Sequence, residues 1–412
     1  MPETAGLPAR RAALRMLDAV LRRGDTLDTA VGAAKGLRPP DAALARAIAG
    51  EVLRRIPDLD ALIDSATRQI LPEDAKVRMV LRMMLVQVLR FGTAPHAVIA
   101  TGLPLLTGGP RRLAHGVFSA LLKREVALPD MPALPQPVED RWNRDWPGRV
   151  DAIASGLADL PPLDIALRDP ADTGVWAERL EAQVMAEGQL RLPRGKAVET
   201  LAGFDDGAWW VQDLAAAIPA SLLGPGQGRT VLDLCAAPGG KTMQLAAAGW
   251  RVTALDIAKR RMERLRQNLA RTGLTADVVT ADALAWDPKF LFDAVLLDAP
   301  CSATGTCRRH PDVLHRIGDA QIRELAELQR RLAERAASWL KPGGTLIYAV
   351  CSLERAEGED QVASIPLRLD PIRSEELPAG LAPAQEGWVR TDPGMLAETG
   401  GLDGFFVARF VR

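Results

Sequence analysis

The chain has 412 residues, of which 48% are hydrophobic and 25% are charged. This ordinary globular composition excludes a disordered or fibrous chain, and a length of about 150 residues per domain suggests two or three domains. The formal net charge is −1, and four scattered cysteines exclude a disulfide framework. Arginines from Arg10 to Arg23 interrupt any leader pattern, and prolines break the uncharged stretch from Phe91 to Pro110. We therefore expect a cytoplasmic protein that does not span a membrane.

Charge is divided unevenly between the two ends of the chain. Residues 1–130 carry 19 Lys and Arg against 13 Asp and Glu, a net charge of +6, and residues 131–412 carry a net charge of −7. This asymmetry indicates an amino-terminal module that meets an acidic partner. Arginine-rich helices with solvated faces explain it equally well.

The first 125 residues predict helices. Apolar residues recur at spacings of three and four in the ranges 11–22, 41–55, 58–70, 73–90 and 111–125. Four prolines within residues 128–137 then predict a stiff linker. The predicted domains are a helical domain over 8–128, a small α+β connecting segment over 138–215 with a helix at 142–160, and a third domain over 216–412.

The third domain has the pattern of an α/β fold. Short apolar runs that predict strands alternate with amphipathic stretches, at 230–234, 251–257, 277–281, 293–297 and 345–350, with a last strand at 404–411. Alternating strands and helices predict a mostly parallel, doubly wound Rossmann-like sheet. Ligands bind such sheets outside the carboxyl ends of the strands.

A glycine loop follows the first of these strands. Gly239 and Gly240 allow the backbone to approach a ligand closely. A Walker A loop would need glycine where Cys235 stands, and a dinucleotide loop would need G-x-G-x-x-G, so both are excluded.

Carboxylates at successive strand ends point to the cofactor. Asp256 can accept the ribose hydroxyls of an adenosine, Asp282 can hold its amino group, and Asp298 ends the next strand. Together with Asp233, these residues would repel a pyrophosphate and would suit a sulfonium cation. We therefore expect S-adenosylmethionine, although each aspartate alone is more often a capping or turn residue.

Two cysteines follow neighbouring strands at the same edge. Cys301 comes after the fourth strand and Cys351 after the fifth, so both are expected to face the cofactor. A single free cysteine is usually a buried apolar residue, but a pair at a catalytic edge favours chemistry. We expect no metal, because no Cys-x-x-Cys occurs and the histidines lack ligand spacing.

A thiol beside a methyl donor suits alkylation of a poorly nucleophilic carbon, such as carbon 5 of a pyrimidine. A thiolate adds to carbon 6, carbon 5 takes the methyl group and loses its proton, and the thiol leaves. An acid near ring nitrogen 3, for which Asp298 is the candidate, would stabilise the adduct. The second thiol is a candidate for the elimination step.

At these residues the chain resembles the Nol/Nop/Sun family of RNA cytosine-5 methyltransferases. The matching stretches are Leu234–Thr242, Asp298–Gly305, Arg308–Asp312, Cys351–Asp360, Asp403–Phe406 and Val211–Asp213. The resemblance implies Cys351 as the nucleophile, Cys301 as the thiol of product release, and Asp298 and Lys241 as further catalytic residues. The cofactor contacts that it implies are Cys235, Ala236, Ala237, Pro238, Gly239, Gly240, Lys241, Asp256, Arg261, Asp282 and Asp298.

The amino-terminal part is similar to NusB-like RNA-binding domains at 77–82, 95–98 and 114–118. The combination resembles the Sun-type bacterial members of the family, which act on 16S, or small-subunit, ribosomal RNA. The chain departs from the family pattern at Val350, which replaces the usual threonine before the nucleophile, and at His115, which replaces an asparagine. Cys307 replaces an aliphatic residue.

Arg308, Arg309 and His310 are candidates for holding RNA phosphates beside a target base, which must be unpaired or flipped to be reached. A solvated turn is the alternative. We expect a monomer with ribosomal RNA as its partner. Transfer RNA as substrate, a non-catalytic ribosome-assembly factor, and a methyltransferase of protein or small molecules remain alternatives. Two strand-end thiols argue against the last, because transfer to nitrogen or oxygen needs no covalent adduct.

Overall fold

A computed structural model describes residues 5–195 and 197–412 of the protein. Its chain forms two compact units, one running to Asp159 and including Cys307–Ile317, the other comprising Leu160–Thr306 and Gly318–Arg412. We call them the helical unit and the sheet unit. In the described part of the chain no helix combines the length and apolarity needed to cross a membrane.

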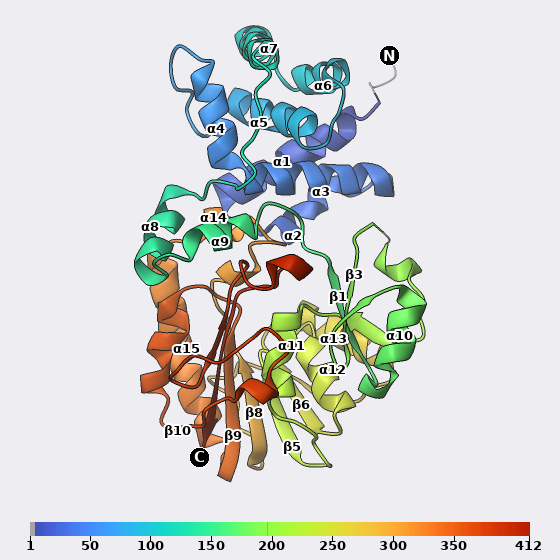
Figure 1. The fold of residues 1–412 in the computed structure, drawn as a ribbon, viewed down its shortest axis with the longest axis vertical. Coiled ribbons are helices and arrows are strands. Elements are labelled where there is room, and N and C mark those ends of the chain that lie inside the picture. Colours follow the sequence, from blue (N-terminus) through green and yellow to red (C-terminus); the bar gives the residue numbers. More distant parts are fainter. Residues whose placement is uncertain (1–4, 196) are drawn as a thin grey trace. The chain divides into compact units, whose positions relative to one another are not determined.

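The helical unit is built almost entirely from helices (Figure 1). They are α1 (Leu7–Arg23), α2 (Leu27–Ala30), α3 (Pro39–Arg54), α4 (Ile56–Ser65), α5 (Lys76–Leu89), α6 (Pro95–Gly102), α7 (Gly108–Lys123), α8 (Gln136–Asp145), α9 (Val150–Ser155) and α14 (Val313–Arg316). Helix α5 is buried from Val77 to Gln87 and is the centre of the packing. Helix α1 ends at Gly24, whose left-handed backbone (φ 72°) directs its N–H to the carbonyls of the last turn.

The proline-rich segment 128–137 is not the linker between units that the sequence predicts. Arg55 is fully buried and donates to the carbonyls of Pro129 and Asp130 at 2.7 and 3.1 Å, while the Ala133 N–H donates to Asp58. These contacts fasten the segment to α3 and α4, so the unit continues to Asp159. The helix predicted at 142–160 is also divided, because Pro147 and Gly148 separate α8 from α9.

The sheet unit begins with a small antiparallel sheet in the order β2-β3-β1-β4. Its strands are β1 (Leu163–Leu167), β2 (Gln183–Ala186), β3 (Gln189–Leu192) and β4 (Trp209–Val211), and α10 (Thr173–Leu180) lies between β1 and β2 in the chain. Arg191 and Asp164 form a buried ion pair across β1 and β3, with an N–O distance of 2.7 Å. The expected α+β character of this segment is confirmed for residues 163–211.

The large sheet has the order β10-β12-β9-β8-β5-β6-β7, with β11 paired to β12. The strands are β5 (Thr230–Leu234), β6 (Arg251–Asp256), β7 (Asp277–Thr280), β8 (Phe292–Asp298), β9 (Leu340–Val350), β10 (Arg368–Leu369), β11 (Val389–Thr391) and β12 (Phe405–Val411). The helices are α11 (Leu214–Ser221), α12 (Gly240–Ala247), α13 (Lys259–Thr272) and α15 (Asp319–Ser338). The strands from β7 to β9 pair in parallel and β12 is antiparallel to β9, which confirms the predicted mostly parallel sheet.

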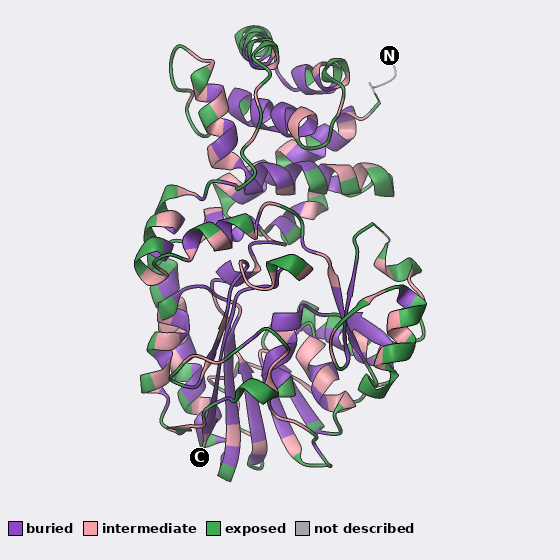
Figure 2. Ribbon diagram, viewed as in Figure 1, coloured by how far each residue is buried: buried purple, intermediate pink, exposed green. Residues whose placement is uncertain are grey.

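Alternate residues of each central strand enter two different cores. Leu232 and Leu234 of β5 pack with residues of α15, whereas Val231 packs with residues of α11 and α12. The sheet is therefore covered on both faces, as Figures 1 and 2 show by purple strands between helices with exposed outer sides. The chain runs from β5 through β6 to β7 and then returns to β8 on the other side of β5, which creates a topological switch point between β5 and β8.

Candidate active site

The carboxyl ends of β5, β8 and β9 lie next to one another at the switch point. Leu234 pairs with Leu297, and Asp298 pairs with Ala349, so the loops that leave these strands start at the same level of the sheet. Cys235 follows β5, Asp298 ends β8, and Cys351 follows β9. The parallel register thus gathers the residues on which the sequence prediction depends at one edge.

The two predicted thiols are in direct contact. Cys301 Sγ and Cys351 Sγ are 3.4 Å apart, and both side chains are half-buried. The hydrogen bond to Cys351, followed by burial and the nearby negative charge of Cys351 and Glu357, raises the pKa of Cys301 well above its ordinary value. Cys301 is therefore the thiol that keeps its proton, and its S–H can donate to Cys351.

Lys241 and Asp298 form an ion pair beside the thiols, with Lys241 Nζ 2.8 Å from Asp298 Oδ2. Burial alone would lower the pKa of Lys241, but attraction to Asp298, and then to Cys351 and Asp233, outweighs it and raises the pKa. The ammonium is held 5.2 Å from the centre of the Phe405 ring. Lys241 therefore places a fixed positive charge near Cys351.

The glycine loop has the backbone geometry of a close-approach site. Cys235 has a left-handed φ of 61° and Gly239 a φ of 107°. A Cβ atom on Gly239 would lie 2.9 Å from Leu265 Cγ, so α13 packs directly against the loop at this point. The N–H groups that begin α12 remain at the edge where a ligand would sit, as expected of a loop between a strand and a helix.

Two buried aspartates support this loop. Asp256 accepts the N–H of Ala237 at 3.3 Å and the N–H of Ala258 at 2.7 Å, which ties the glycine loop to the start of α13. Asp233 is completely buried, and its Oδ2 accepts the Thr242 hydroxyl at 2.6 Å while its Oδ1 has no hydrogen-bond partner among the described residues. Burial raises the pKa of Asp233 to about 7. An unpartnered buried carboxylate oxygen is an acceptor that an ordered water or a bound group would satisfy.

Other predicted residues lie further out. Asp282 is exposed and caps its own turn through the Leu284 N–H at 2.9 Å, and Arg261 is more than half exposed and pairs with Asp256 at 3.1 Å. Arg308, Arg309 and His310 belong to the helical unit. Arg308 is only 2% exposed, which argues against its predicted contact with a phosphate, while Arg309 and His310 are half-buried.

One buried carboxylate at this edge was not given a role from the sequence. Glu357 lies in the short helix η6 (Arg355–Glu357), six positions after Cys351, and it contacts residues of both cysteine loops. Its place inside the Cys351–Asp360 stretch was the available signal. Sequence spacing alone gives no indication that its side chain turns back toward Ser302.

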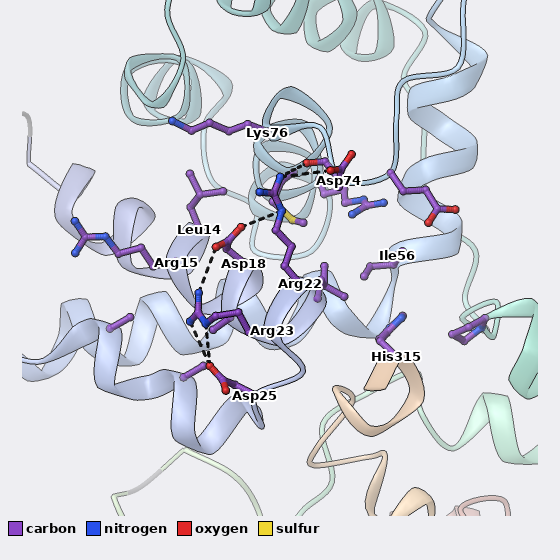
Figure 3. A pocket seen from close by; sticks show the side chains of 18 of the residues that line it. Leu14, Arg15, Asp18, Arg22, Arg23, Asp25, Ile56, Asp74, Lys76 and His315 are labelled. Carbon is purple, nitrogen blue, oxygen red and sulfur yellow. Dashed lines mark hydrogen bonds and ion pairs between the residues drawn. The ribbon is translucent and has the colours of Figure 1, made fainter. Parts of the chain in front are cut away.

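A separate cavity of about 1080 Å³ lies in the helical unit (Figure 3). Arg22 pairs with Asp18 and Asp74, and Arg23 with Asp18 and Asp25. The charged residues of the wall balance in sign; they are Arg15, Arg22, Arg23, Lys76 and Arg82 against Asp18, Asp25, Asp60, Glu73 and Asp74. The positive charge of the first 130 residues is therefore not concentrated here.

Known proteins match this chain at both ends. The family model described as 16S rRNA methyltransferase RsmB/F matches residues 220–411, and the NusB family model matches residues 7–105. Ribosomal RNA small subunit methyltransferase B of Cronobacter sakazakii is 31% identical over 98% of both chains. The protein of the same name from Xanthomonas campestris is 34% identical over 99% of this chain and 98% of its own.

The chain belongs to the RsmB/F family of 16S rRNA methyltransferases. A solved structure, that of PH0851, covers 98% of this chain and 99% of its own with a TM-score of 0.76 at 23% identity, which shows the same fold. The predicted combination of a NusB-like domain with a methyltransferase sheet is confirmed.

Proposed function

We propose that this RsmB/F family member transfers a methyl group from S-adenosylmethionine to carbon 5 of a cytosine in 16S ribosomal RNA. The observation that carries the proposal is the pair of thiols 3.4 Å apart at the switch-point edge. Methyl transfer to nitrogen or oxygen would need neither of them. The names of the relatives that match almost the whole chain support the RNA substrate.

The residues of the glycine loop fit this cofactor. The unpartnered Oδ1 of Asp233, together with Asp256 and Asp298, makes the site acidic, which suits a sulfonium cation and disfavours a pyrophosphate. Asp256 and the loop from Cys235 to Lys241 would hold the adenosine and the amino acid part. Exposed Asp282 would close the adenine end, and Arg261 would fix Asp256 in place. When bound, S-adenosylmethionine supplies the electrophilic methyl group that carbon 5 takes up.

Cys351 acts as the nucleophile in this proposal. A lone pair of its thiolate sulfur forms the bond to carbon 6 of the cytosine, and the electrons of the carbon 5–carbon 6 double bond become available at carbon 5. The positive charge of Lys241 lies near this sulfur, and the S–H of Cys301 can donate to it. Asp298 is placed at the same edge to face the ring once its bond to Lys241 rearranges.

Cys301 acts later in this proposal, and the contact between the two thiols supports this order. Its pKa is raised first by its bond to Cys351. Once Cys351 is a thioether it carries no negative charge, so this cause disappears and Cys301 ionises more readily, releasing its proton to solvent. The Cys301 thiolate then takes the proton of carbon 5. That electron pair restores the double bond, and the sulfur–carbon 6 bond breaks toward Cys351.

The partner in this proposal is small-subunit ribosomal RNA, bound by a monomer in the cytoplasm. Arg309 and His310 are the candidates for RNA contact in the segment that follows the Cys301 loop. Transfer RNA as substrate is the second candidate and would use the same residues and chemistry. Running both RNAs in the assay below separates the two.

A denaturing gel tests the proposal. Purified protein, S-adenosylmethionine and unmodified small-subunit ribosomal RNA are combined with wild type, Cys301→Ala and Cys351→Ala. We expect a slow protein–RNA band in Cys301→Ala, methylated RNA without a persistent band in wild type, and neither in Cys351→Ala. Cys307→Ala is the control for loss of a cysteine outside this pair, because Cys307 belongs to the helical unit, and it should methylate the RNA without a persistent band. A band in Cys351→Ala instead would exchange the two roles, and absence of methylated cytosine in wild type would overturn the proposal.

A further inference from the structure

Glu357 is a fully buried carboxylate with four hydrogen-bond donors around it. Its Oε1 accepts the backbone N–H of Ser302 at 2.9 Å and the side-chain amide of Gln329 at 3.0 Å. Its Oε2 accepts the hydroxyls of Ser302 and Ser352, each at 2.5 Å. An ionised carboxylate has about four lone-pair sites, so the acceptor capacity of Glu357 is filled.

The two serines that donate to Glu357 are sequence neighbours of the two cysteines. Ser302 directly follows Cys301, and Ser352 directly follows Cys351. One carboxylate therefore bridges the two loops that carry the thiols, one peptide unit away from each cysteine. Because the thiols themselves are only 3.4 Å apart, a small shift of either loop changes their separation by a large fraction.

The carboxylate is itself held in place from the scaffold. Gln329 of α15 also donates to the carbonyl of Pro300, the residue before Cys301, at 2.9 Å. The Tyr348 hydroxyl of β9 donates to the Glu357 carbonyl at 2.6 Å and contacts Gln329 at 3.2 Å. The bridge thus rests on a helix and a strand, which position a site more accurately than loops do.

Burial of a carboxylate is unfavourable, and burial raises the pKa of Glu357 despite the bonds from both serines. An apolar side chain would fill the space without this cost. The presence of a carboxylate there is explained by its hydrogen bonds to the two loops that carry the cysteines.

We propose that Glu357 is the positioning residue that sets the separation of Cys301 and Cys351. For the meaning of that separation the inference rests on the proposed function. With the bridge intact, Cys301 is within reach of Cys351 before the adduct forms and of carbon 5 afterwards. Without it, the Cys301 loop loses its register with the nucleophile loop, so product release is impaired more than adduct formation.

Thiol separation can be measured without RNA. In glutathione redox buffers the equilibrium for a Cys301–Cys351 disulfide gives the effective concentration of one thiol at the other, and peptide mapping identifies the bond. We expect Glu357→Gln to lower this effective concentration by about tenfold or more, and Ser352→Ala by a smaller factor. The matched control is Glu376→Gln, which removes a carboxylate of the same unit that pairs with Arg409 instead. An unchanged value in Glu357→Gln, with the fold retained by circular dichroism, would overturn the proposal.

Kinetics supply the second measurement. We expect Glu357→Gln to accumulate the protein–RNA adduct that wild type clears, with multiple-turnover methylation reduced about tenfold more than the rate of adduct formation. Equal loss of both rates in the folded variant would indicate a general structural role and contradict the proposal. If Glu357→Gln fails to fold, the disulfide equilibrium and the two rates are measured in Ser352→Ala instead, and unchanged values there would contradict the proposal. If wild type forms no adduct and methylates no RNA, the proposed function fails, while the thiol equilibrium still tests Glu357.

Discussion

Asp233 lies beneath the glycine loop with one oxygen hydrogen-bonded to Thr242 and the other without a partner in the part of the chain that the structure describes. Its pKa is raised from 3.8 to about 7 by burial. At a pH between these two pKa values, Asp233 is protonated in the folded state and ionised in the unfolded state. Asp233 therefore makes the fold less stable as pH rises from about 4 to 7. Above pH 7 the folded state bears the full cost of burying the ionised carboxylate, on the order of a few kcal/mol of unfolding free energy.

Asp233→Asn should remove this penalty and keep the bond from Thr242, because the amide oxygen can accept it. We expect the variant to melt at a higher temperature than wild type at pH 8, with the difference shrinking toward pH 5. Thermal unfolding across this range is the measurement. A variant less stable than wild type at pH 8 would show that the ionised form is compensated in the folded protein.

The same residue should link cofactor affinity to pH. A sulfonium cation favours the ionised carboxylate, so S-adenosylmethionine should bind wild type roughly tenfold more tightly at pH 8 than at pH 6 and release a proton on binding near pH 6. Calorimetry in buffers of different ionisation enthalpy counts that proton. In Asp233→Asn we expect weaker binding with a flat pH profile, and a profile as steep as that of wild type would assign the dependence to another group.

Several arginines of the helical unit are buried in ion pairs that the sequence pattern does not predict. The sequence indicates either an acidic partner or solvated faces for the basic amino-terminal part, yet Arg54, Arg78 and Arg82 are almost wholly buried in ion pairs with Glu51, Asp64 and Asp60. Arg54 and Glu51 lie within α3, but Arg78 and Arg82 of α5 meet carboxylates of α4, and a helical spacing does not predict which charged residue lies opposite a carboxylate from another helix. Part of the positive charge of the amino-terminal residues is therefore neutralised by carboxylates inside the helical unit.

Elements with a strong local pattern were predicted closely. Strand β5 begins and ends where the sequence places it, and β6, β7 and β12 differ by a residue, because runs of apolar residues bounded by glycine or polar residues are a local property. Strand β9 begins at Leu340 and not at 345, since Leu340 also pairs with Phe292 of β8, across a shift of register from the Ala294–Thr345 pair. The end points of pairing depend on the neighbour, which a single sequence does not give.

The cofactor loop depends on two adjacent glycines in different ways. Gly239 needs a left-handed φ and its Cβ would clash with Leu265, whereas a Cβ on Gly240 would make ordinary contact with Gln212 at 3.7 Å. We expect Gly239→Ala to cost about 1–3 kcal/mol of stability and to weaken S-adenosylmethionine binding at least tenfold. Gly240→Ala is the matched control and should change stability by less than about 1 kcal/mol. Thermal unfolding with and without the cofactor measures both effects, and equal losses of stability in the two variants without cofactor would contradict this assignment.

At the scale of the whole molecule, the helical unit contains a piece of the catalytic half of the sequence. Residues Cys307–Ile317 begin directly after the Cys301 loop and belong to the helical unit. Within that unit His315 Nε2 donates to the Leu53 carbonyl at 2.7 Å, and Asp312 accepts the Leu27 N–H at 3.2 Å. No linear domain prediction could assign this segment, because these contacts are with residues 262 and 285 positions earlier. Deleting residues 1–128 would therefore remove the surroundings of this segment as well as any RNA-binding surface.

Arg54 offers a more selective test of this connection. Its buried guanidinium donates to the carbonyls of Leu157 and Arg308 at 3.0 and 2.8 Å and pairs with Glu51. Arg54→Met leaves these acceptors without a donor, and we expect a loss of about 2–4 kcal/mol in stability. Because Arg308 lies two residues beyond Thr306, we also expect faster hydrogen exchange over 307–317 and slower turnover, with cofactor affinity unchanged.

The control and the contradicting result make this test specific. Arg112→Met makes the same chemical change on the exposed side of α7 and should alter neither exchange nor turnover. Hydrogen-exchange mass spectrometry on the full chain follows the segment directly. If Arg54→Met raises exchange over 307–317 while turnover stays at the wild-type rate, the helical unit holds the segment without influencing the Cys301 loop. If turnover falls with cofactor affinity intact, the segment transmits the state of the helical unit to the thiol of product release, because the two are joined by a single short stretch of backbone.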